Sequence, residues 1–292
     1  MHKVFLGIMM FPVLIWGAET PQITPAPDTL PDLVEATKPE SKETKKSENR
    51  LSFNVSASLL SEYTNVVGIT LCKVPIATTE LGASYKTNFG AIYAGTWDSY
   101  KVNMKGRYGQ TSGDEIDAWI GWSNTWKNWV STDLTAYEFD LEGPKGGVGR
   151  INNDLFAADL KVGIVGLKRS WFVPYVKTRF AEPLGDKGPE KGWFSWIGFS
   201  GSQKTGLYFQ SRPVSLNYDV SYGHSWGLFA RDPGPIFVQS VVSLPVPVWK
   251  HMSITPCLRY LKPIGAQSGS SDDFANKQKP RLIFGLSLNW KF

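Results

Sequence analysis

The sequence predicts an all-β protein, an antiparallel transmembrane β-barrel of about 12 strands with long outer loops and short periplasmic turns. Three observations lead to this prediction. From residue 51 onward, apolar and polar residues alternate with the period of two that a half-buried strand shows. The connections between these segments alternate between long and short along the chain. Tryptophans gather near the segment ends, as they do in the aromatic girdles of membrane barrels.

The alternation is clearest at the end of the chain. One face of that segment is apolar: Leu282, Phe284, Leu286, Leu288, Trp290 and Phe292. The other face is mostly small or polar: Arg281, Gly285, Ser287, Asn289 and Lys291. The same pattern recurs over residues 52–59, 80–86, 115–123, 156–164 and 214–222, and no stretch after Arg50 keeps a helical period.

The connections set the number of strands. Long polar connections are predicted near residues 61–77, 100–114, 141–153, 182–191, 225–235 and 262–280. Short turns are predicted near residues 87–88, 125–127, 166–169, 202–205 and 247–249. Residues 206–224 are then interpreted as one long strand bent at Pro213, which gives twelve strands. An even number of strands places both chain ends on the periplasmic side.

A soluble β-sandwich or jelly roll would also alternate, so it is the alternative fold. Two features favour the barrel: the polar faces carry small residues suited to a wet lumen, and seven tryptophans lie at segment ends. These are Trp97, Trp126, Trp129, Trp171, Trp193, Trp249 and Trp290. Pro174 and Pro256 count against it, because each removes a hydrogen bond from a sheet that has no edge.

Composition excludes several classes. The 292 residues hold 31 Lys and Arg against 26 Asp and Glu, and the mean hydropathy of −0.20 excludes a polytopic helical membrane protein. Twelve Trp, 11 Tyr and 16 Phe exclude a wholly disordered chain. The net charge of +5 comes without a basic cluster in the folded part, so no nucleic-acid partner is predicted. Two cysteines and three histidines leave little for metal chemistry, and no metal or cofactor is predicted.

The chain divides into three parts. Residues 1–18 are predicted to be a secretory signal peptide, with Lys3 before an apolar stretch and small residues at Gly17 and Ala18. Residues 19–50, rich in proline and charge, are predicted to be a disordered periplasmic linker. Residues 51–292 form the predicted outer-membrane barrel, which would contact outer-membrane lipid.

Two resemblances support the barrel. The ending Leu288-Asn289-Trp290-Lys291-Phe292 resembles the C-terminal signal of outer-membrane proteins, which implies that Leu288, Trp290 and Phe292 are read by the barrel assembly machinery. Residues 90–99 (GAIYAGTWDS) followed by residues 114–122 (DEIDAWIGW) are similar to the TorF-type putative porin family, and residues 61–63 fit the opening of that family. The second resemblance covers roughly residues 51–140 and implies a porin-like function.

The predicted function is passive diffusion of small hydrophilic solutes through the outer membrane, without enzymatic activity. The proposed pore-lining residues are Glu80, Lys86, Asp98, Glu115, Asp117, Asp133, Asp159, Lys161, Lys177, Arg179, Arg212, Asp219 and Arg259. Such charges can create a field that selects solutes, or they can form ion pairs that plug a narrow barrel. The alternative functions are a non-conducting structural or adhesion barrel that acts through its outer loops, and a lipid-modifying enzyme.

Two smaller questions stay open at the level of sequence. The enzyme would use His224 and Ser225, but adjacent residues of a strand face opposite sides, so these two are not expected to act together. Cys72 and Cys257 meet oxidising conditions after export, and they form either a disulfide or two separate thiols.

Overall fold

The computed structural model describes most of the chain after residue 49. The described residues are 50–64, 70–72, 74–102, 115–141, 155–167, 171–184, 191–227, 233–265 and 279–292. The predicted signal peptide and linker, apart from Arg50, lie outside this part, as do large sections of the long connections. The described residues contain no helix that is long and apolar enough to cross a membrane.

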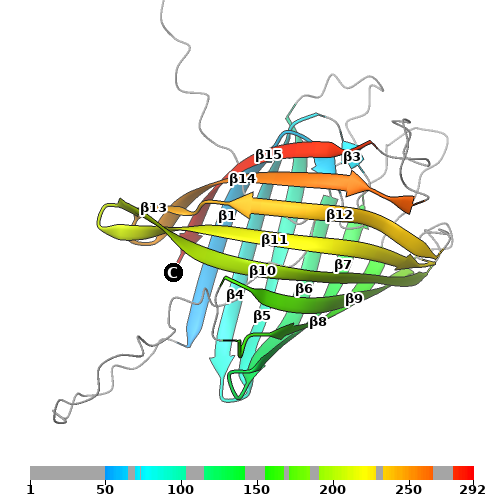
Figure 1. Cartoon of the computed structure of the whole chain (residues 1–292), viewed down its shortest axis with the longest axis horizontal. Helices are drawn as coiled ribbons and strands as arrows, with labels where there is room; N and C mark the ends of the chain where they lie inside the picture. The colour runs from blue at the N-terminus through cyan, green and yellow to red at the C-terminus, as the bar shows by residue number, and fades with distance from the viewer. Residues whose placement is uncertain are drawn as a thin grey trace, which may run out of the picture.

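The fold is a closed antiparallel barrel of twelve strands, as the alternation predicted. The wall consists of β1 (Leu51–Leu60), β4 (Ile76–Thr87), β5 (Gly90–Lys101), β6 (Glu115–Trp126), β7 (Val130–Leu141), β8 (Leu155–Ile164), β9 (Val173–Pro183), β10 (Gly192–Phe209), β11 (Arg212–Trp226), β12 (Gly234–Ser243), β13 (Val246–Trp249), β14 (Met252–Pro263) and β15 (Arg281–Lys291). β12 and β13 follow one another along β14 and share one place in the wall. Figure 1 shows β10, β11, β12 and β14 passing in front of β1, β4 and β5.

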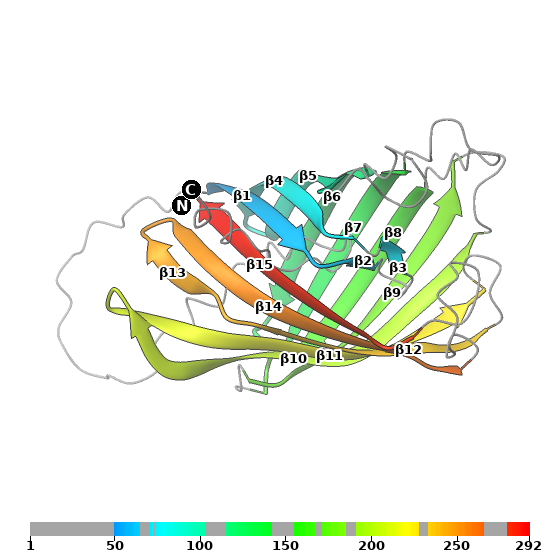
Figure 2. The same cartoon turned by 90° about the horizontal axis from the view of Figure 1, so that it is seen from above.

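The last strand closes the barrel on the first one. β15 pairs antiparallel with β1, from Asn54 opposite Lys291 to Leu60 opposite Gly285. Phe53 and Phe292 extend this seam, because the amide of each donates to the carbonyl of the other at 3.1 and 2.9 Å. Figure 2 shows the C-terminus beside the start of β1, at the end of the barrel where the short turns lie. The chain therefore has no free sheet edge along this seam.

The register separates an inner face from an outer face. Large apolar side chains point outward and are about half exposed: Leu81, Ile92, Ile120, Leu134, Leu160, Val176, Ile197 and Phe284 have exposed fractions between 45 and 60 %. The residues that alternate with them on the inner face include serines, glycines and charged residues. An apolar outer band around a more polar interior is the arrangement that a lipid bilayer favours.

Two predicted turns lie at other positions than the sequence indicated. The sequence predicted a turn at residues 202–205, but β10 runs on to Phe209 and the chain reverses at Gln210 and Ser211. Both residues have positive φ, 49° and 62°, as a type I′ hairpin requires. The predicted bend at Pro213 is the second residue of β11 instead, and the strand count stays at twelve because the turn only moved. The turn predicted at 247–249 likewise lies at Lys250 and His251.

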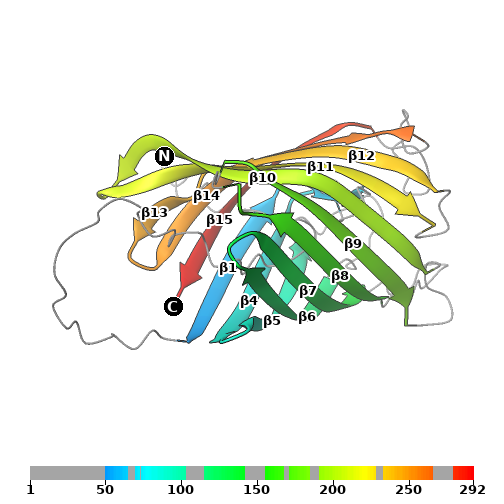
Figure 3. The ribbon, with the colours of Figure 1, turned by 60° about the horizontal axis from the view of Figure 1, so that its bottom comes forward.

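The β10–β11 hairpin extends beyond the rest of the wall. β9 pairs with β10 only as far as Ser200, and β12 pairs with β11 only from Asn217. Residues 201–216 therefore form a two-stranded ribbon on the side of the short turns, as Figure 3 shows. Leu207 and Tyr208 at its tip are 61 and 70 % exposed.

Most of the tryptophans that were predicted to form an aromatic girdle lie at strand ends. Trp126, Trp129, Trp171, Trp193 and Trp249 are 49 to 73 % exposed at the strand ends. Trp290 is half-buried on the outer face of β15. Trp97 is the exception, since its side chain faces the lumen and is 1 % exposed. The two prolines are accommodated in the wall: Pro174 lies opposite Phe199, and Pro256 opposite Leu286.

Candidate pore lining

The lumen has two unlike halves, which we name by the connections nearest to them. The turn-side half carries small polar side chains that are partly exposed: Ser52, Asn54, Ser84, Ser131, Ser200, Ser202, Asn217 and Asn289. The loop-side half carries large apolar side chains that are almost fully buried: Leu60, Ile76, Trp97, Tyr137, Phe139, Leu155, Phe194, Trp196, Phe237, Leu261 and Ile283. Because side chains on the inner wall of an empty barrel keep one side exposed, the burial shows that the loop-side half is filled.

Aromatic rings pack against each other in the loop-side half, both along one strand and between strands. Phe194 lies edge-on to Trp196, with ring centroids 4.2 Å apart, and 5.9 Å from Phe237 on β12. Tyr137 and Phe139 stack on β7 at 5.4 Å. Each contact of this kind contributes about 0.5–1.5 kcal/mol of stabilisation in addition to the free energy gained by burying the apolar surface. The loop-side half is therefore packed like the core of a soluble domain.

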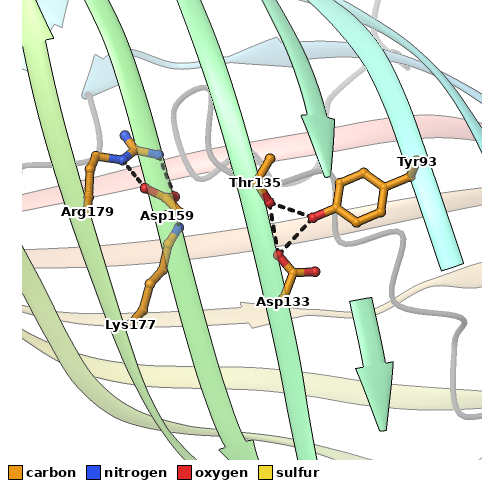
Figure 4. Close-up of polar contacts among 6 residues, drawn as sticks. All are labelled: Tyr93, Asp133, Thr135, Asp159, Lys177 and Arg179. Atoms are coloured by element: carbon orange, nitrogen blue, oxygen red, sulfur yellow. Dashed lines mark hydrogen bonds and ion pairs between the residues drawn. The ribbon is translucent and has the colours of Figure 1, made fainter. Parts of the chain in front are cut away.

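Charged groups enter this packing as a compact cluster. The Asp159 carboxylate on β8 accepts two hydrogen bonds from the Arg179 guanidinium on β9, at 2.6 and 2.8 Å. It also forms an ion pair of 2.8 Å with the Lys177 ammonium, and all three side chains are at most 4 % exposed. Arg179 lies over the rings of Tyr137 and Phe139 at 5.0 and 5.3 Å. Figure 4 shows the two cations converging on the single carboxylate.

A second polar group lies nearer the turn-side half. The Tyr93 hydroxyl donates to Asp133 at 2.8 Å, and the Thr135 hydroxyl donates to the same carboxylate at 2.9 Å (Figure 4). Farther round the wall, the Tyr175 hydroxyl on β9 donates to Asp219 on β11 at 3.0 Å. The Lys161 ammonium lies 4.3 Å from the centre of the Tyr175 ring. These phenols hold two carboxylates at the boundary between the dry and the wet part of the lumen.

The first long connection supplies a residue to the lumen. Its short strands β2 (Tyr63–Thr64) and β3 (Thr70–Cys72) pair with each other, and the Tyr63 side chain is 5 % exposed among the apolar residues of the loop-side half. The Tyr63 hydroxyl donates to Glu115 at 2.8 Å, and its ring lies 5.8 Å from Trp97. Before it, Glu62 forms an ion pair of 3.6 Å with Arg281 on β15. We call residues 61–64 the strap.

Charged groups on β6 and on β14 affect the pKa of the Tyr63 phenol in opposite directions. Burial raises the pKa of Tyr63 well above its usual value, and the Glu115 and Asp117 carboxylates on β6 raise it further. Arg259 on β14 lowers the same pKa. The phenol therefore stays protonated and remains a hydrogen-bond donor to Glu115 at any physiological pH. No sequence pattern signals this role of Tyr63, because the strap reaches the lumen only through the tertiary fold.

The register places most of the proposed pore-lining residues on the inner face. Those in the wall at inner positions are Glu80, Lys86, Glu115, Asp117, Asp133, Asp159, Lys161, Lys177, Arg179, Asp219 and Arg259. Whether they line a path for solutes stays a prediction. The fold brings Asp159, Lys177 and Arg179 into direct contact, and the Arg259 guanidinium donates to Gln239 at 2.6 Å. Lys86 lies at the turn-side rim and is exposed.

Two of the proposed residues lie elsewhere. Asp98 is on the outer face of β5, between the inward side chains of Trp97 and Ser99, and accepts a hydrogen bond from Thr79 at 3.3 Å. Its charge suggested the inner face, but the alternation of β5 places tyrosine and tryptophan inside. Arg212 lies on the projecting ribbon, where its guanidinium donates to the Trp249 carbonyl, so it is not part of the lumen wall.

In the structure, the serine beside His224 is not the one that the enzyme hypothesis names. His224 lies on the outer face of β11, directly opposite Ser195 on β10, while Ser225 faces inward. The Ser195 hydroxyl accepts a hydrogen bond from the Trp226 indole at 3.1 Å, and the His224 ring packs 4.2 Å from Trp226. Within the described residues, the δ1 nitrogen of His224 has no hydrogen-bond partner. No base–nucleophile hydrogen bond is formed here.

Metal ligation and the cysteines add little to the site. The described part of the chain has no group of three or more His, Cys, Asp or Glu side chains that could hold a metal ion. Cys257 lies at an inner position of β14, opposite Gly285. The Cys72 side chain lies outside the described residues, so a disulfide between Cys72 and Cys257 stays a prediction.

Comparison with known proteins shows no family for this chain. No protein-family model and no curated protein matches the chain. Among solved structures, it is similar to the KdgM porin in complex with disordered oligogalacturonate, with a TM-score of 0.46 and 7 % identity over 82 % of this chain and 99 % of that one. It is also similar to a bacterial polysaccharide outer membrane secretin, with a TM-score of 0.45 and 10 % identity over 85 % of this chain and 100 % of the other. The β domain of the Bordetella autotransporter BrkA gives 0.40 and 10 %, over 82 % of this chain and 98 % of that domain. All three are outer-membrane barrels.

Proposed function

We propose that the protein is an outer-membrane, porin-like channel for small hydrophilic solutes, and that the strap closes its lumen in the conformation described above. The turn-side half supports a path for solutes, because its inner wall is lined by partly exposed hydroxyl and amide groups. The proposal includes an outer-membrane location and recognition of Leu288, Trp290 and Phe292 by the barrel assembly machinery. It also includes the likeness of residues 51–140 to the TorF-type putative porins.

The position of the strap carries the gating part of this proposal. Tyr63 lies among the buried side chains of the loop-side half and contacts β5 and β6 through Trp97 and Glu115. The Glu62–Arg281 ion pair and hydrogen bonds between Ser61 and Phe284 tie the neighbouring described residues to β15. The strap is not one of the paired strands of the wall, so it can leave the lumen at a lower free-energy cost than the unfolding of a wall strand.

The non-conducting barrel is the second candidate function, and a specific observation favours it. The loop-side half is filled by packed aromatic side chains, of which Trp97 and Trp196 are only 1 % exposed. If this packing is permanent, the protein acts through its outer loops and passes no solute. The two functions predict different currents once the strap is removed.

Single-channel recording in a planar bilayer separates the two. The refolded chain without residues 1–18 is compared with its Tyr63→Ala variant. We expect rare or small current steps for the parent chain and frequent, larger steps for the variant. Ser200→Ala, a change in the half that is already wet, serves as the control and is expected to behave like the parent. Absence of current from both the parent and a folded Tyr63→Ala barrel would favour the structural role.

A further inference from the structure

Three hydrogen-bond donors in the loop-side half lack a partner. They are the Thr78 hydroxyl on β4 and the indole nitrogens of Trp97 on β5 and Trp119 on β6, and none has an acceptor among the described residues. All three side chains are at most 5 % exposed. A buried donor without an acceptor costs free energy, so native structures rarely keep one without a reason. Three such donors on three consecutive strands mark this part of the wall.

The same part of the wall carries acceptors. Trp97 lies directly opposite Glu80 on β4 and Asp117 on β6. Glu115 lies two positions before Asp117 on the same face of β6, and Trp119 lies two positions after it. Side chains directly opposite on neighbouring strands have Cβ atoms about 5 Å apart, and alternate residues of one strand are about 7 Å apart. Thr78, Glu80, Trp97, Glu115, Asp117 and Trp119 therefore form one continuous inner surface, which we call the β4–β6 surface.

We propose that the β4–β6 surface binds uncharged, polyhydroxylated solutes, such as short neutral sugars, once the strap has moved away. This inference rests on the proposed channel function and names the class of solute that the channel recognises. A hydroxyl group both donates and accepts, so one sugar ring can accept from the two indoles and donate to the carboxylates. The flat indole rings give the C–H face of the sugar an apolar surface to lie on.

Charged ligands fit this surface less well. An anion would face three carboxylates, Glu80, Glu115 and Asp117, in a part of the lumen where water does not screen them. A cation would suit the carboxylates, but it would leave the indole and hydroxyl donors without acceptors. Only a ligand that carries both donors and acceptors satisfies the whole set.

The strap explains why this surface is covered at rest. Tyr63 occupies the position of such a ligand in two respects, since its hydroxyl donates to Glu115 and its ring lies against Trp97. The single hydroxyl of Tyr63 accepts from neither indole nitrogen, that of Trp97 or that of Trp119. A sugar with several hydroxyls can replace the phenol and satisfy these donors as well, so it competes with the strap for the same surface.

Isothermal titration calorimetry with the full mature chain in detergent micelles tests this proposal, with maltotriose as the probe. Tyr63→Ala is the background in which the surface is uncovered. In that background, Trp97→Phe and Trp119→Phe remove one indole donor each and keep a ring. We expect each to weaken maltotriose binding about 5- to 10-fold, the loss of one net hydrogen bond. Gluconate, a polyhydroxylated anion, is expected to bind at least tenfold more weakly than maltotriose.

The matched control is Trp126→Phe, because the Trp126 indole donates to Thr132 on the outer face at 2.9 Å, and its affinity for maltotriose should not change. Circular dichroism verifies that each variant has the β-structure of the parent. The proposal is overturned if folded Tyr63→Ala binds no maltotriose, if all three Trp variants bind alike, or if gluconate binds as tightly. Calorimetry needs no current, so binding without conductance rejects only the channel, and conductance without binding rejects only this inference.

Discussion

The two halves of the lumen share one wall and differ in almost everything else. On β10, Phe194 and Trp196 in the loop-side half are 0 and 1 % exposed, while Ser200 and Ser202 a few residues later are partly exposed. The same strand thus passes from a packed core into a wet vestibule within about 20 Å of its length. A barrel wall can therefore be packed like a folded core at one end and stay accessible to solvent at the other.

The largest effect is expected from the buried charge cluster. Asp159→Asn leaves the cations of Lys177 and Arg179 without their carboxylate in the filled half. Removing one partner of a buried ion pair costs about 3–5 kcal/mol, so the free energy of unfolding in urea should fall by that amount. Glu182→Gln is the control, because its ion pair with Lys191 spans 3.9 Å at the surface and is worth far less. Equal losses for both variants would show that the loop-side half is not dry.

A smaller effect is expected from the strap. Tyr63→Phe keeps the ring against Trp97 and removes only the hydroxyl that donates to Glu115. A buried acceptor that loses its donor costs about 1–3 kcal/mol, and urea unfolding should report a loss in this range. Tyr208→Phe, at the exposed ribbon tip, is the matched control and should leave stability unchanged. A stability equal to that of the parent would mean that water replaces the phenol, which contradicts the filled lumen.

Substitution of two inner-face glycines tests how tightly each part of the lumen is packed. A Cβ at Gly95 would lie 2.5 Å from the Trp119 ring and 2.4 Å from the Leu81 carbonyl oxygen, so neither neighbour can simply turn away. Gly95→Ala should cost about 1–3 kcal/mol through overpacking. At Gly163, the near contact is the Ser131 hydroxyl at 2.7 Å, the free end of a side chain. Gly163→Ala should therefore cost clearly less in the same urea experiment, and the reverse order would contradict the packing described for Trp119.

The smallest effect is expected in the turn-side half. Ser200→Ala removes one hydroxyl from a wall that water reaches, and the free energy of unfolding should change by less than about 0.5 kcal/mol. Thr135→Val, where the hydroxyl donates to Asp133 and is 1 % exposed, is the comparison and should cost more. A large loss from Ser200→Ala would place this residue in a packed environment and move the boundary between the halves.

The sequence predicts the wall far better than the lumen. Alternation along 281–292 and 115–123 depends only on local periodicity, which any strand with one lipid-facing side must show. The hairpin at Gln210 and Ser211 escapes prediction because positive φ values usually call for glycine or asparagine, and neither residue gives that signal. The charge of Asp98 wrongly predicts an inner position, because on β5 the large aromatic residues Tyr93 and Trp97 take the inner positions.

The interior of the site could not be predicted because it depends on residues distant in sequence. The charge cluster needs β8 beside β9 in a single register, with Asp159 opposite Arg179. The contact between Tyr63 and Glu115 joins the first long connection to β6, and no local pattern encodes it. Sequence alternation states which residues face inward, but it does not state which of them meet.

The seam between the first and last strands has a consequence for the order of folding. A hydrogen bond between Phe284 and Ser61 joins residues 223 positions apart, and every pair between β1 and β15 spans a similar distance along the chain. Pairs of such high contact order form slowly, because the entropy of closing a long loop must be overcome before any contact rewards it. The hairpins from β4 to β14 can form early, whereas the seam forms only once β1 and β15 meet. Until then both outer strands present unpaired edges, and the rate of ring closure sets how long the nascent sheet can be captured by other chains.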